Sequence, residues 1–373
     1  MKRLILVLMV TVLSLAFLSA CTPNRTQQQP QNDINPSPVQ ETPQQSPQTD
    51  EEQPPMADMP EYYIYTSNED DSTVSVINMA TMNVTATVPV GKGPHNVQVT
   101  PDGNFIYVVE NANNTISAID AETNTLTKTI KVGEGPSHTI FSPDSKTAYV
   151  TVAEMAAAEG ADSSGGHSMT ENPKNGNVYV VDLESGNVTA KIPVGMMPQG
   201  LRMSPDGKFI YVANTDSNEV SVIDLAENKT VKNIKVGNKP VQVAFSQDSK
   251  LAFVTISGEN RVEVIDTVTM EKKRLIAVGE SPIQVYGTPD GKFMYVANSG
   301  SNDISVINTA QFNTVATIPA GNKAYGVAVS KDGKSVFVTN KEDNSVTIVD
   351  TSNNSVVGTI QVGKSPYGIT IKD

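Results

Sequence analysis

The chain has 373 residues but only one cysteine, Cys21, and three histidines. A single cysteine excludes an intramolecular disulfide in any compartment. The sequence also lacks the Gly-x-Ser-x-Gly, Walker-type, HExxH and Cys-x-x-Cys-His motifs, so no familiar catalytic motif is visible. Basic residues are scarce as well, because 27 Lys and Arg stand against 40 Asp and Glu, a formal net charge of −13. This acidic balance opposes binding to phosphate backbones, and we expect no nucleic-acid partner.

What the sequence does contain is a repeat. The motif Val-Gly-x-x-Pro at Val90–Pro94 returns six more times with small changes, and its glycines are 42, 62, 42, 42, 42 and 42 residues apart. Each copy alternates short apolar runs with turn residues such as Pro101–Gly103, which is typical of four strands. Asparagines that suit a left-handed turn recur between the second and third strands, at Asn114, Asn218, Asn260, Asn302 and Asn344. A four-stranded repeat with a period in the forties indicates a β-propeller.

The two ends of the repeat region are complementary. The N-terminal copy lacks a first strand, and the C-terminal segment Tyr367–Ile371 lacks the other three. Pairing these remainders in one sheet would close the ring and hide its edges. We therefore predict an all-β, seven-bladed β-propeller over residues 61–373. One copy carries 20 extra residues between its second and third strands, which predicts an insertion at about 153–177.

The second strands carry a recognisable signature. Tyr211–Asn214, Tyr295–Asn298 and Phe337–Asn340, each followed by Val-Ser-Val-Ile-Asp or a near variant, resemble the YVTN-type β-propeller repeat. That family includes exported bacterial and archaeal surface propellers, and it is similar in repeat style to the propeller of cytochrome cd1 nitrite reductase. The resemblance covers residues 61–373 and implies the fold, but it implies no particular activity.

The N-terminus is typical of an export signal. Two basic residues and the apolar run Leu4–Phe17 precede Leu18–Cys21, which resembles the bacterial lipobox, where the cysteine is lipidated. We expect a signal peptide over residues 1–20, then lipidated Cys21 and a disordered Pro/Gln-rich tether over 21–60. The lipid alone would hold the protein on the extracytoplasmic side, either on the outer face of the plasma membrane or in the periplasm. The alternative is an ordinary signal peptide with a chance cysteine.

The innermost strands of a propeller line its central channel, so residues just after the Val-Gly-x-x-Pro proline are expected at the channel mouth. The candidate ligand-binding residues are His95, Asn96, His138, Gln199, Gln242, Gln284, Tyr325 and Tyr367. This set has no carboxylate, which weighs against a calcium-dependent lactonase site. The alternative is that the amides only satisfy backbone groups near the axis. We interpret the acidic runs Glu69–Asp71 and Glu342-Asp343 as solvated turns, with a weak cation site as the alternative.

The second-to-third connections should emerge on the same face as the Val-Gly-x-x-Pro loops, which places the insertion above the channel mouth. His95, His138, His167 and Met196 then form a candidate metal set, because imidazole and thioether ligands suit copper(I) or haem iron. The alternative is that these histidines are turn or channel residues and the methionines fill gaps. Our first expectation is no cofactor, with copper or haem as the alternative.

Together these features predict a non-catalytic binding module that is lipid-anchored outside the cytoplasm. Its partner would be a protein, cell-envelope or small-molecule ligand at the insertion-bearing face. One alternative is a redox-associated periplasmic protein that handles a metal or haem. A second alternative is a lactonase-type hydrolase.

Overall fold

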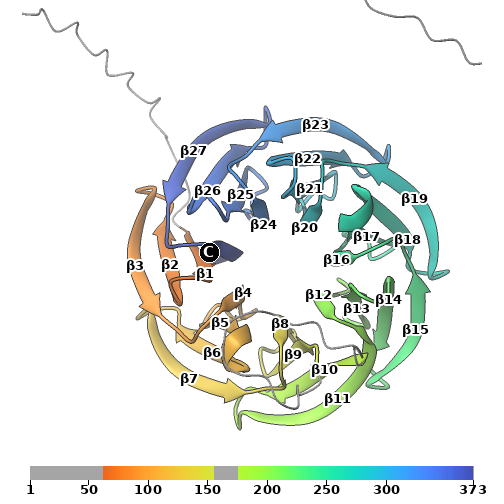
Figure 1. Ribbon diagram of the computed structural model, residues 1–373, viewed down its shortest axis with the longest axis horizontal. Helices are drawn as coiled ribbons and strands as arrows, with labels where there is room; N and C mark the ends of the chain where they lie inside the picture. The colour runs from red at the N-terminus through yellow and green to blue at the C-terminus, as the bar shows by residue number, and fades with distance from the viewer. Residues whose placement is uncertain (1–61, 155–174, 373) are drawn as a thin grey trace, which may run out of the picture. The chain divides into compact units, whose positions relative to one another are not determined.

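The computed structural model describes residues 62–154 and 175–372. These residues form seven four-stranded antiparallel sheets that follow one another round a central axis (Figure 1). The seven-bladed β-propeller predicted from the repeat is therefore confirmed. The predicted signal peptide, Cys21 and the tether lie outside the described residues and stay predictions. Within the described ranges, no helix is long and apolar enough to cross a membrane.

We number the blades from the sheet that closes the ring, and each blade runs from an inner to an outer strand. Blade 1 contains β28 (Pro366–Lys372), β1 (Tyr63–Asn68), β2 (Thr73–Asn78) and β3 (Asn83–Pro89). Blade 2 contains β4 (Pro94–Val99), β5 (Phe105–Glu110), β6 (Thr115–Asp120) and β7 (Thr125–Lys131). Blade 3 contains β8 (Pro136–Phe141), β9 (Thr147–Val152), β10 (Asn175–Asp182) and β11 (Asn187–Met196). Blade 4 contains β12 (Pro198–Met203), β13 (Phe209–Asn214), β14 (Glu219–Asp224) and β15 (Lys229–Lys235).

The remaining blades repeat this pattern. Blade 5 contains β16 (Pro240–Phe245), β17 (Leu251–Ile256), β18 (Arg261–Asp266) and β19 (Glu271–Ala277). Blade 6 contains β20 (Pro282–Gly287), β21 (Phe293–Asn298), β22 (Asp303–Asn308) and β23 (Asn313–Pro319). Blade 7 contains β24 (Ala324–Val329), β25 (Ser335–Asn340), β26 (Ser345–Asp350) and β27 (Ser355–Gln361). Two 3-10 turns, η1 (Asn111–Asn113) and η2 (Ser257–Glu259), precede the left-handed residues Asn114 and Asn260.

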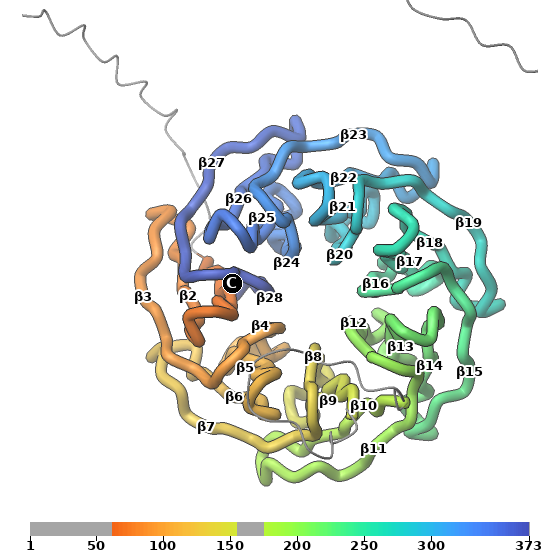
Figure 2. The backbone as a smooth tube through the Cα atoms, in the orientation of Figure 1, coloured from red at the N-terminus to blue at the C-terminus, as the bar shows by residue number. Residues whose placement is uncertain are grey.

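The C-terminal strand closes the ring as predicted. Strand β28 pairs antiparallel with β1, and Tyr65 lies opposite Thr370 in this register. The hydroxyl of Thr66 also donates to the carbonyl of Gly368 at 2.9 Å, which adds a side-chain bond to the ladder. Figure 2 shows β28, in dark blue, beside the orange strands of the same blade. The edge that each chain end would leave exposed is thereby paired.

The hydrophobic core is divided among the seams between blades. The described residues form seven buried clusters, and each cluster joins two neighbouring sheets. The seam between blades 7 and 1, for example, contains Ile64, Ile77, Phe337 and Ile348. The inner three strands of a blade are mostly buried, whereas outer strands such as β3 alternate between exposed and partly buried residues. This alternation follows from one face of the outer strand pointing to solvent.

The repeated Gly and Asn residues hold the connections together. In blade 7, the Asn340 amide donates to Ser345 Oγ at 3.0 Å and Thr347 Oγ1 at 2.8 Å. Its Oδ1 accepts the backbone N–H of Gly321 at 3.0 Å. A Cβ on Gly321 would lie within 2.8 Å of the Asn340 side chain, so only glycine permits this approach. The asparagine of the second-strand signature and the glycine of Val-Gly-x-x-Pro thus act as one unit.

The insertion also lies where the sequence placed it. Strand β9 ends at Val152 and β10 begins at Asn175, so the extra residues separate the second and third strands of blade 3. Strands β10 and β11 have 8 and 10 residues, and Asn175 pairs with Met196 beyond the length of the other blades. Residues 155–174, including His167, are outside the described ranges. The expectation that His167 joins the other histidines stays a prediction.

Candidate functional site

Two kinds of connection form one face of the propeller, which we call the mouth face. The backbone N–H of Glu69, after β1, donates to the carbonyl of Ser365 in a Val-Gly-x-x-Pro loop at 3.1 Å. The backbone N–H of Glu154, the last described residue before the insertion, donates to the carbonyl of Glu134 in the corresponding loop at 3.1 Å. The chain therefore lies beside these loops at Glu154, where the described part of this connection ends. The Pro-Asp-Gly-type and third-to-fourth turns form the opposite face, which we call the turn face.

Three aromatic side chains from three blades form a continuous row at the channel mouth. The rings of His95 and Tyr367 are stacked, with centroids 4.4 Å apart and an interplanar angle of 3°. The ring of Tyr325 lies 4.3 Å from that of Tyr367, and its hydroxyl donates to the Tyr367 hydroxyl at 2.7 Å. Each residue follows the proline position of an inner strand, namely β4, β28 or β24. Stacked rings with hydrogen-bonding tips form an amphipathic surface.

An ion pair covers this aromatic row. Glu69 lies between Lys341 Nζ, at 2.6 Å, and His95 Nε2, at 3.1 Å. Lys341 also sits over the rings of Tyr325 and Tyr367, 5.2 and 4.8 Å from their centroids. The side chains of Glu69 and Lys341 are 27% and 24% exposed. Our interpretation of Glu69 as part of a solvated turn was therefore wrong, because this carboxylate pairs with residues from blades 2 and 7.

The electrostatics of the mouth follow from these contacts. The hydrogen bond from His95 lowers the pKa of Glu69 to about 2, and Lys341 adds to this effect while burial opposes it. Burial raises the pKa of Tyr325 to about 12, with a further contribution from the charge of Glu69. Burial likewise raises the pKa of Tyr367 well above its usual range. At neutral pH the mouth therefore presents one carboxylate and two protonated phenols.

Beside this row, the mouth is lined by smaller polar and aliphatic residues. Ser137 Oγ donates to Gln199 Oε1 at 2.9 Å and contacts His138 Nδ1 at 3.0 Å. Across the ring, the equivalent positions are the partly buried Val241 and Ile283. The mouth therefore has an aromatic, a polar and an aliphatic sector.

The imidazole of His138 lies below the mouth and is 4% exposed. Because Ser137 Oγ donates to Gln199, it accepts from His138 Nδ1–H, and His138 Nε2 carries the lone pair. No hydrogen-bond partner of this buried Nε2 is found in the described part of the chain. Burial lowers the pKa of His138 to about 3, and the neighbouring His95 and Arg202 act in the same direction. The ring is therefore neutral at physiological pH.

The predicted amide residues next to the axis lie at the same depth as His138. Three of them form hydrogen bonds to backbone N–H groups. Asn96 Oδ1 accepts the backbone N–H of Thr139 at 3.1 Å, and Gln284 Oε1 accepts that of Val327 at 3.1 Å. Each bond joins one blade to the next. Gln242 is 6% exposed and bonds through Oε1 to the N–H of Val243 at 3.2 Å. These three amides thus satisfy backbone groups near the axis, which the sequence left open as an alternative.

The axis itself is nearly closed. The cavity lined by Asn96, His138, Gln242 and Gln284 has a volume of about 20 Å³. This volume is enough for about one water molecule. A ligand larger than one water molecule would not fit in this cavity.

Comparison with known proteins agrees with this architecture. The sequence profile of the YNCE-like beta-propeller family matches residues 43–373. The chain belongs to the YNCE-like beta-propeller family. This result confirms the resemblance to YVTN-type propellers that the second-strand signature indicated. No curated protein matches the chain significantly.

Two solved structures have similar folds. A chain of Kuenenia stuttgartiensis hydrazine synthase has a TM-score of 0.66 and 24% identity, covering 77% of this chain and 92% of its own. A functionally unknown protein from Desulfotomaculum acetoxidans DSM 771 has a TM-score of 0.70 and 15% identity, covering 83% of this chain and 98% of its own. At these identities the likeness concerns the fold alone.

In this YNCE-like propeller, the described members of the candidate metal set have different surroundings. His95 Nε2 bonds to Glu69, whereas its buried Nδ1 has no partner among the described residues. His138 Nε2 is likewise unpartnered there, and half-buried Met196 ends β11 on the mouth face. Within residues 62–154 and 175–372, no group of three or more His, Cys, Asp or Glu is placed to hold a metal. Unpartnered imidazole nitrogens are nevertheless ligands of the kind that copper(I) accepts.

Proposed function

We propose that this YNCE-like propeller is a lipid-anchored, extracytoplasmic binding module that performs no reaction and holds its ligand on the mouth face. The observation that carries the proposal is the row of His95, Tyr367 and Tyr325 above an axis with room for about one water molecule. The row and its ion pair form a rigid surface, while the closed axis directs any ligand to that surface.

The chemistry of the mouth suits a protein or cell-envelope ligand with both apolar and polar groups. Tyrosine supplies a large contact area with little loss of conformational entropy, and it is enriched at the centres of protein interfaces. The aliphatic sector, formed by Val241 and Ile283, offers a complementary apolar contact. Glu154, which precedes the insertion of blade 3, lies at the same face, and the insertion would add a specific contact there. The described residues give no comparable support for a catalytic function.

Site-specific photo-crosslinking in the native host tests this proposal. A crosslinking residue at Lys92, which is exposed beside His95, samples the mouth face. The matched control is Val268, which is 80% exposed in a third-to-fourth turn on the opposite face. We expect a discrete adduct from position 92 that is lost in Tyr325→Ala, and none from position 268. Equal adducts from both positions, or none from either, would overturn the mouth as the binding face.

The anchor is tested separately. Metabolic labelling with a tagged fatty acid should label the full chain and leave Cys21→Ala unlabelled, and fractionation should move that variant out of the membrane fraction. A membrane-bound, unlabelled wild-type protein would contradict lipid anchoring. The mouth-face proposal would survive that result, because the crosslinking experiment depends only on the folded propeller.

Copper handling is the second candidate function, and the unpartnered nitrogens His95 Nδ1 and His138 Nε2 favour it. Bound copper would supply redox chemistry or a transferable ion, and the two imidazoles, with His167 and Met196, would be its ligands. Anaerobic titration of the full chain with copper(I) against a competing chelator measures this directly. One equivalent bound by wild type and lost in His138→Phe supports the idea. No uptake at chelator concentrations that still release copper would overturn it.

A further inference from the structure

A repeated contact at the seams between blades points to a second site, on the turn face. The second strand of each blade carries a Tyr or Phe that faces the third-to-fourth turn of the next blade. The last residue of that turn has a positive φ in every blade: Met82, Asn124, Gly186, Asn228, Met270, Phe312 and Asn354. Six copies therefore place a side chain there, and blade 3 has only the hydrogen of Gly186.

In five of these six copies the side chain at this turn position packs in the seam, whereas Asn228, opposite Tyr149, is exposed. In two seams it is an asparagine that accepts from the tyrosine hydroxyl: Tyr65 Oη to Asn124 Oδ1 at 2.9 Å, and Tyr295 Oη to Asn354 Oδ1 at 2.9 Å. In three other seams an apolar side chain packs into the cluster of its aromatic partner. These pairs are Met270 with Tyr211, Phe312 within the cluster of Phe253, and Met82 within that of Phe337.

The seam between blades 2 and 3 departs from this pattern. The aromatic residue is Tyr107, which is 4% exposed, and the turn opposite ends in Gly186 with φ +75°. No hydrogen bond of Tyr107 Oη is present among the described residues. The equivalent hydroxyls of Tyr65 and Tyr295 each have one, whereas that of Tyr211, opposite the apolar Met270, has none there. Burial raises the pKa of Tyr107, so its hydroxyl keeps its proton at neutral pH. The seam thus has a donor but lacks the side chain that accepts from it.

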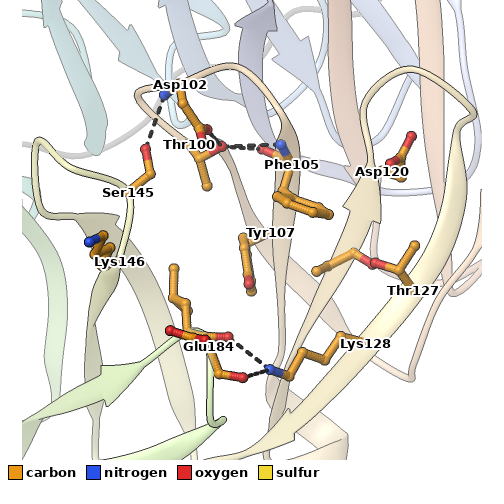
Figure 3. A pocket seen from close by; sticks show the side chains of 12 residues that line it. Thr100, Asp102, Phe105, Tyr107, Asp120, Thr127, Lys128, Ser145, Lys146 and Glu184 are labelled. Atoms are coloured by element: carbon orange, nitrogen blue, oxygen red, sulfur yellow. Dashed lines mark hydrogen bonds between the residues drawn. The ribbon is translucent and has the colours of Figure 1, made fainter.

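A pocket of about 540 Å³ lies at this place, and its volume falls within the range of small-ligand sites. Figure 3 shows Tyr107 in the middle of the pocket, with Phe105 on one side and Lys128 on the other. Lys128 Nζ donates to the carbonyls of Leu183 and Glu184, at 2.8 Å each, so its charge is held against the glycine turn. Ser145 and Lys146 form another part of the lining.

We propose that this seam pocket binds a small ligand through an amide group, whose carbonyl oxygen accepts from Tyr107 Oη. The filled seams supply the template, because a tyrosine at the same position donates to an asparagine carboxamide oxygen twice in this chain. The exposed edge of Phe105, 36% accessible, and the stem of Lys128 provide apolar contact for the remainder of the ligand. The site lies on the turn face, so it is independent of the function proposed for the mouth.

Substitution of the glycine gives a specific test, because the chain already shows which residues the position tolerates. A Cβ at Gly186 would meet Lys128 Cε at 3.5 Å, an ordinary contact distance. Asparagine occupies the same backbone conformation at Asn124, with φ 54°. Gly186→Asn should therefore fold, fill the pocket and occupy the Tyr107 hydroxyl. Tyr107→Phe removes the donor and leaves the pocket open.

Ligand binding to the full chain is measured by saturation-transfer NMR with two amide probes, N-acetyl-D-glucosamine and N-acetyl-L-asparagine amide, and with D-glucose as the control that lacks the amide. We expect at least one amide probe to bind at concentrations up to about 10 mM. We expect Gly186→Asn to abolish the signal and Tyr107→Phe to weaken affinity about threefold to tenfold, the effect of one hydrogen bond. Preference for the sugar or for the amino acid would show which source of the amide the pocket prefers.

Three outcomes would overturn the proposal: no binding of either amide probe, equal binding of D-glucose, or binding unchanged in Gly186→Asn. Thermal melting controls for folding. If Gly186→Asn melts at or above the wild-type temperature and no longer binds, the loss comes from occupation of the pocket. If that variant fails to fold, Tyr107→Phe and the D-glucose comparison still decide the question.

Discussion

The ion pair between Glu69 and Lys341 joins blade 1 to blade 7, where the two ends of the chain close the ring. We expect Glu69→Gln to destabilise the propeller at neutral pH, although glutamine keeps an oxygen that can accept from His95. The pKa of Glu69 falls from 4.5 to about 2 on folding. Taken alone, this lowering of the pKa corresponds to about 3 kcal/mol. Because the side chain is 27% exposed, solvent screens part of this energy, and we expect about 1–2 kcal/mol.

The pH dependence distinguishes this charge effect from a loss of packing. A carboxylate whose folded pKa is depressed contributes stability that is fully present above its unfolded pKa, here 4.5, and that disappears as pH falls toward 2. The difference between wild type and Glu69→Gln should therefore be largest at pH 7 and close to zero near pH 2. A propeller of this size should lose about 2–6 °C in melting temperature at pH 7.

Circular dichroism is the suitable assay, because the chain contains no tryptophan for fluorescence. Melting curves at pH 7, 5, 4 and 3 should be recorded for wild type, Glu69→Gln and the control Glu342→Gln. Glu342 is exposed on the equivalent connection of blade 7, and it has no ion pair in the described part of the chain. We expect the control to follow wild type at every pH. A Glu69→Gln deficit that is the same at pH 3 as at pH 7 would refute the electrostatic reasoning.

Three further predictions concern the seams and the closure. Deleting Tyr367–Asp373 should cost more than about 5 kcal/mol, since it removes a whole sheet strand with three buried side chains, whereas deleting residues 34–40 should leave the melting temperature unchanged. Similar melting temperatures of the two deletion variants would contradict the closure. Asn340→Ala should cost about 2 kcal/mol in urea unfolding, because three hydrogen bonds are lost. Tyr65→Phe should cost about 1 kcal/mol, whereas Tyr211→Phe should be neutral or stabilising, because the Tyr211 hydroxyl is buried without a partner in the described residues. The opposite order for these two variants would show that the seam contacts are assigned incorrectly.

The sequence predicted the ring well because the ring depends on information that lies within one repeat. Alternating apolar residues, the turn glycines and the second-strand asparagine all act over a few tens of residues, and each is repeated in nearly every blade. Seven blades, the closing strand and the place of the insertion could therefore be derived from spacing alone. The inward position of Asn96, His138 and Gln242 also followed, since side chains alternate along a strand.

The mouth could be predicted only in part. His95, Tyr325 and Tyr367 were identified because they follow the proline position of the repeat. Glu69 and Lys341 were missed because they are 272 positions apart and meet only after the ring has closed. Their opposite charges at equivalent positions of the first and last blades were the available signal. The stacking of His95 on Tyr367 was not visible either, because it depends on the tilt of two inner strands. The placement of His138 Nε2 in a nearly closed channel likewise required coordinates.

A repeat protein supplies its own comparison, because each position occurs once in every blade and a departure stands out against the other copies. Some departures are compensated within the chain. Glu263 is fully buried where most blades have serine or threonine, and Arg261 bonds to its Oε1 at 2.7 Å, so the charge of this carboxylate is paired within the chain. The departure at Gly186 is not compensated in this way. A side chain at this position would meet the Tyr107 hydroxyl, which has no hydrogen-bond partner among the described residues. Blade 3 therefore lacks the hydrogen bond between tyrosine hydroxyl and carboxamide that two other seams contain. A ligand that supplies the missing carbonyl oxygen would form this bond with a hydroxyl that the fold already holds in place.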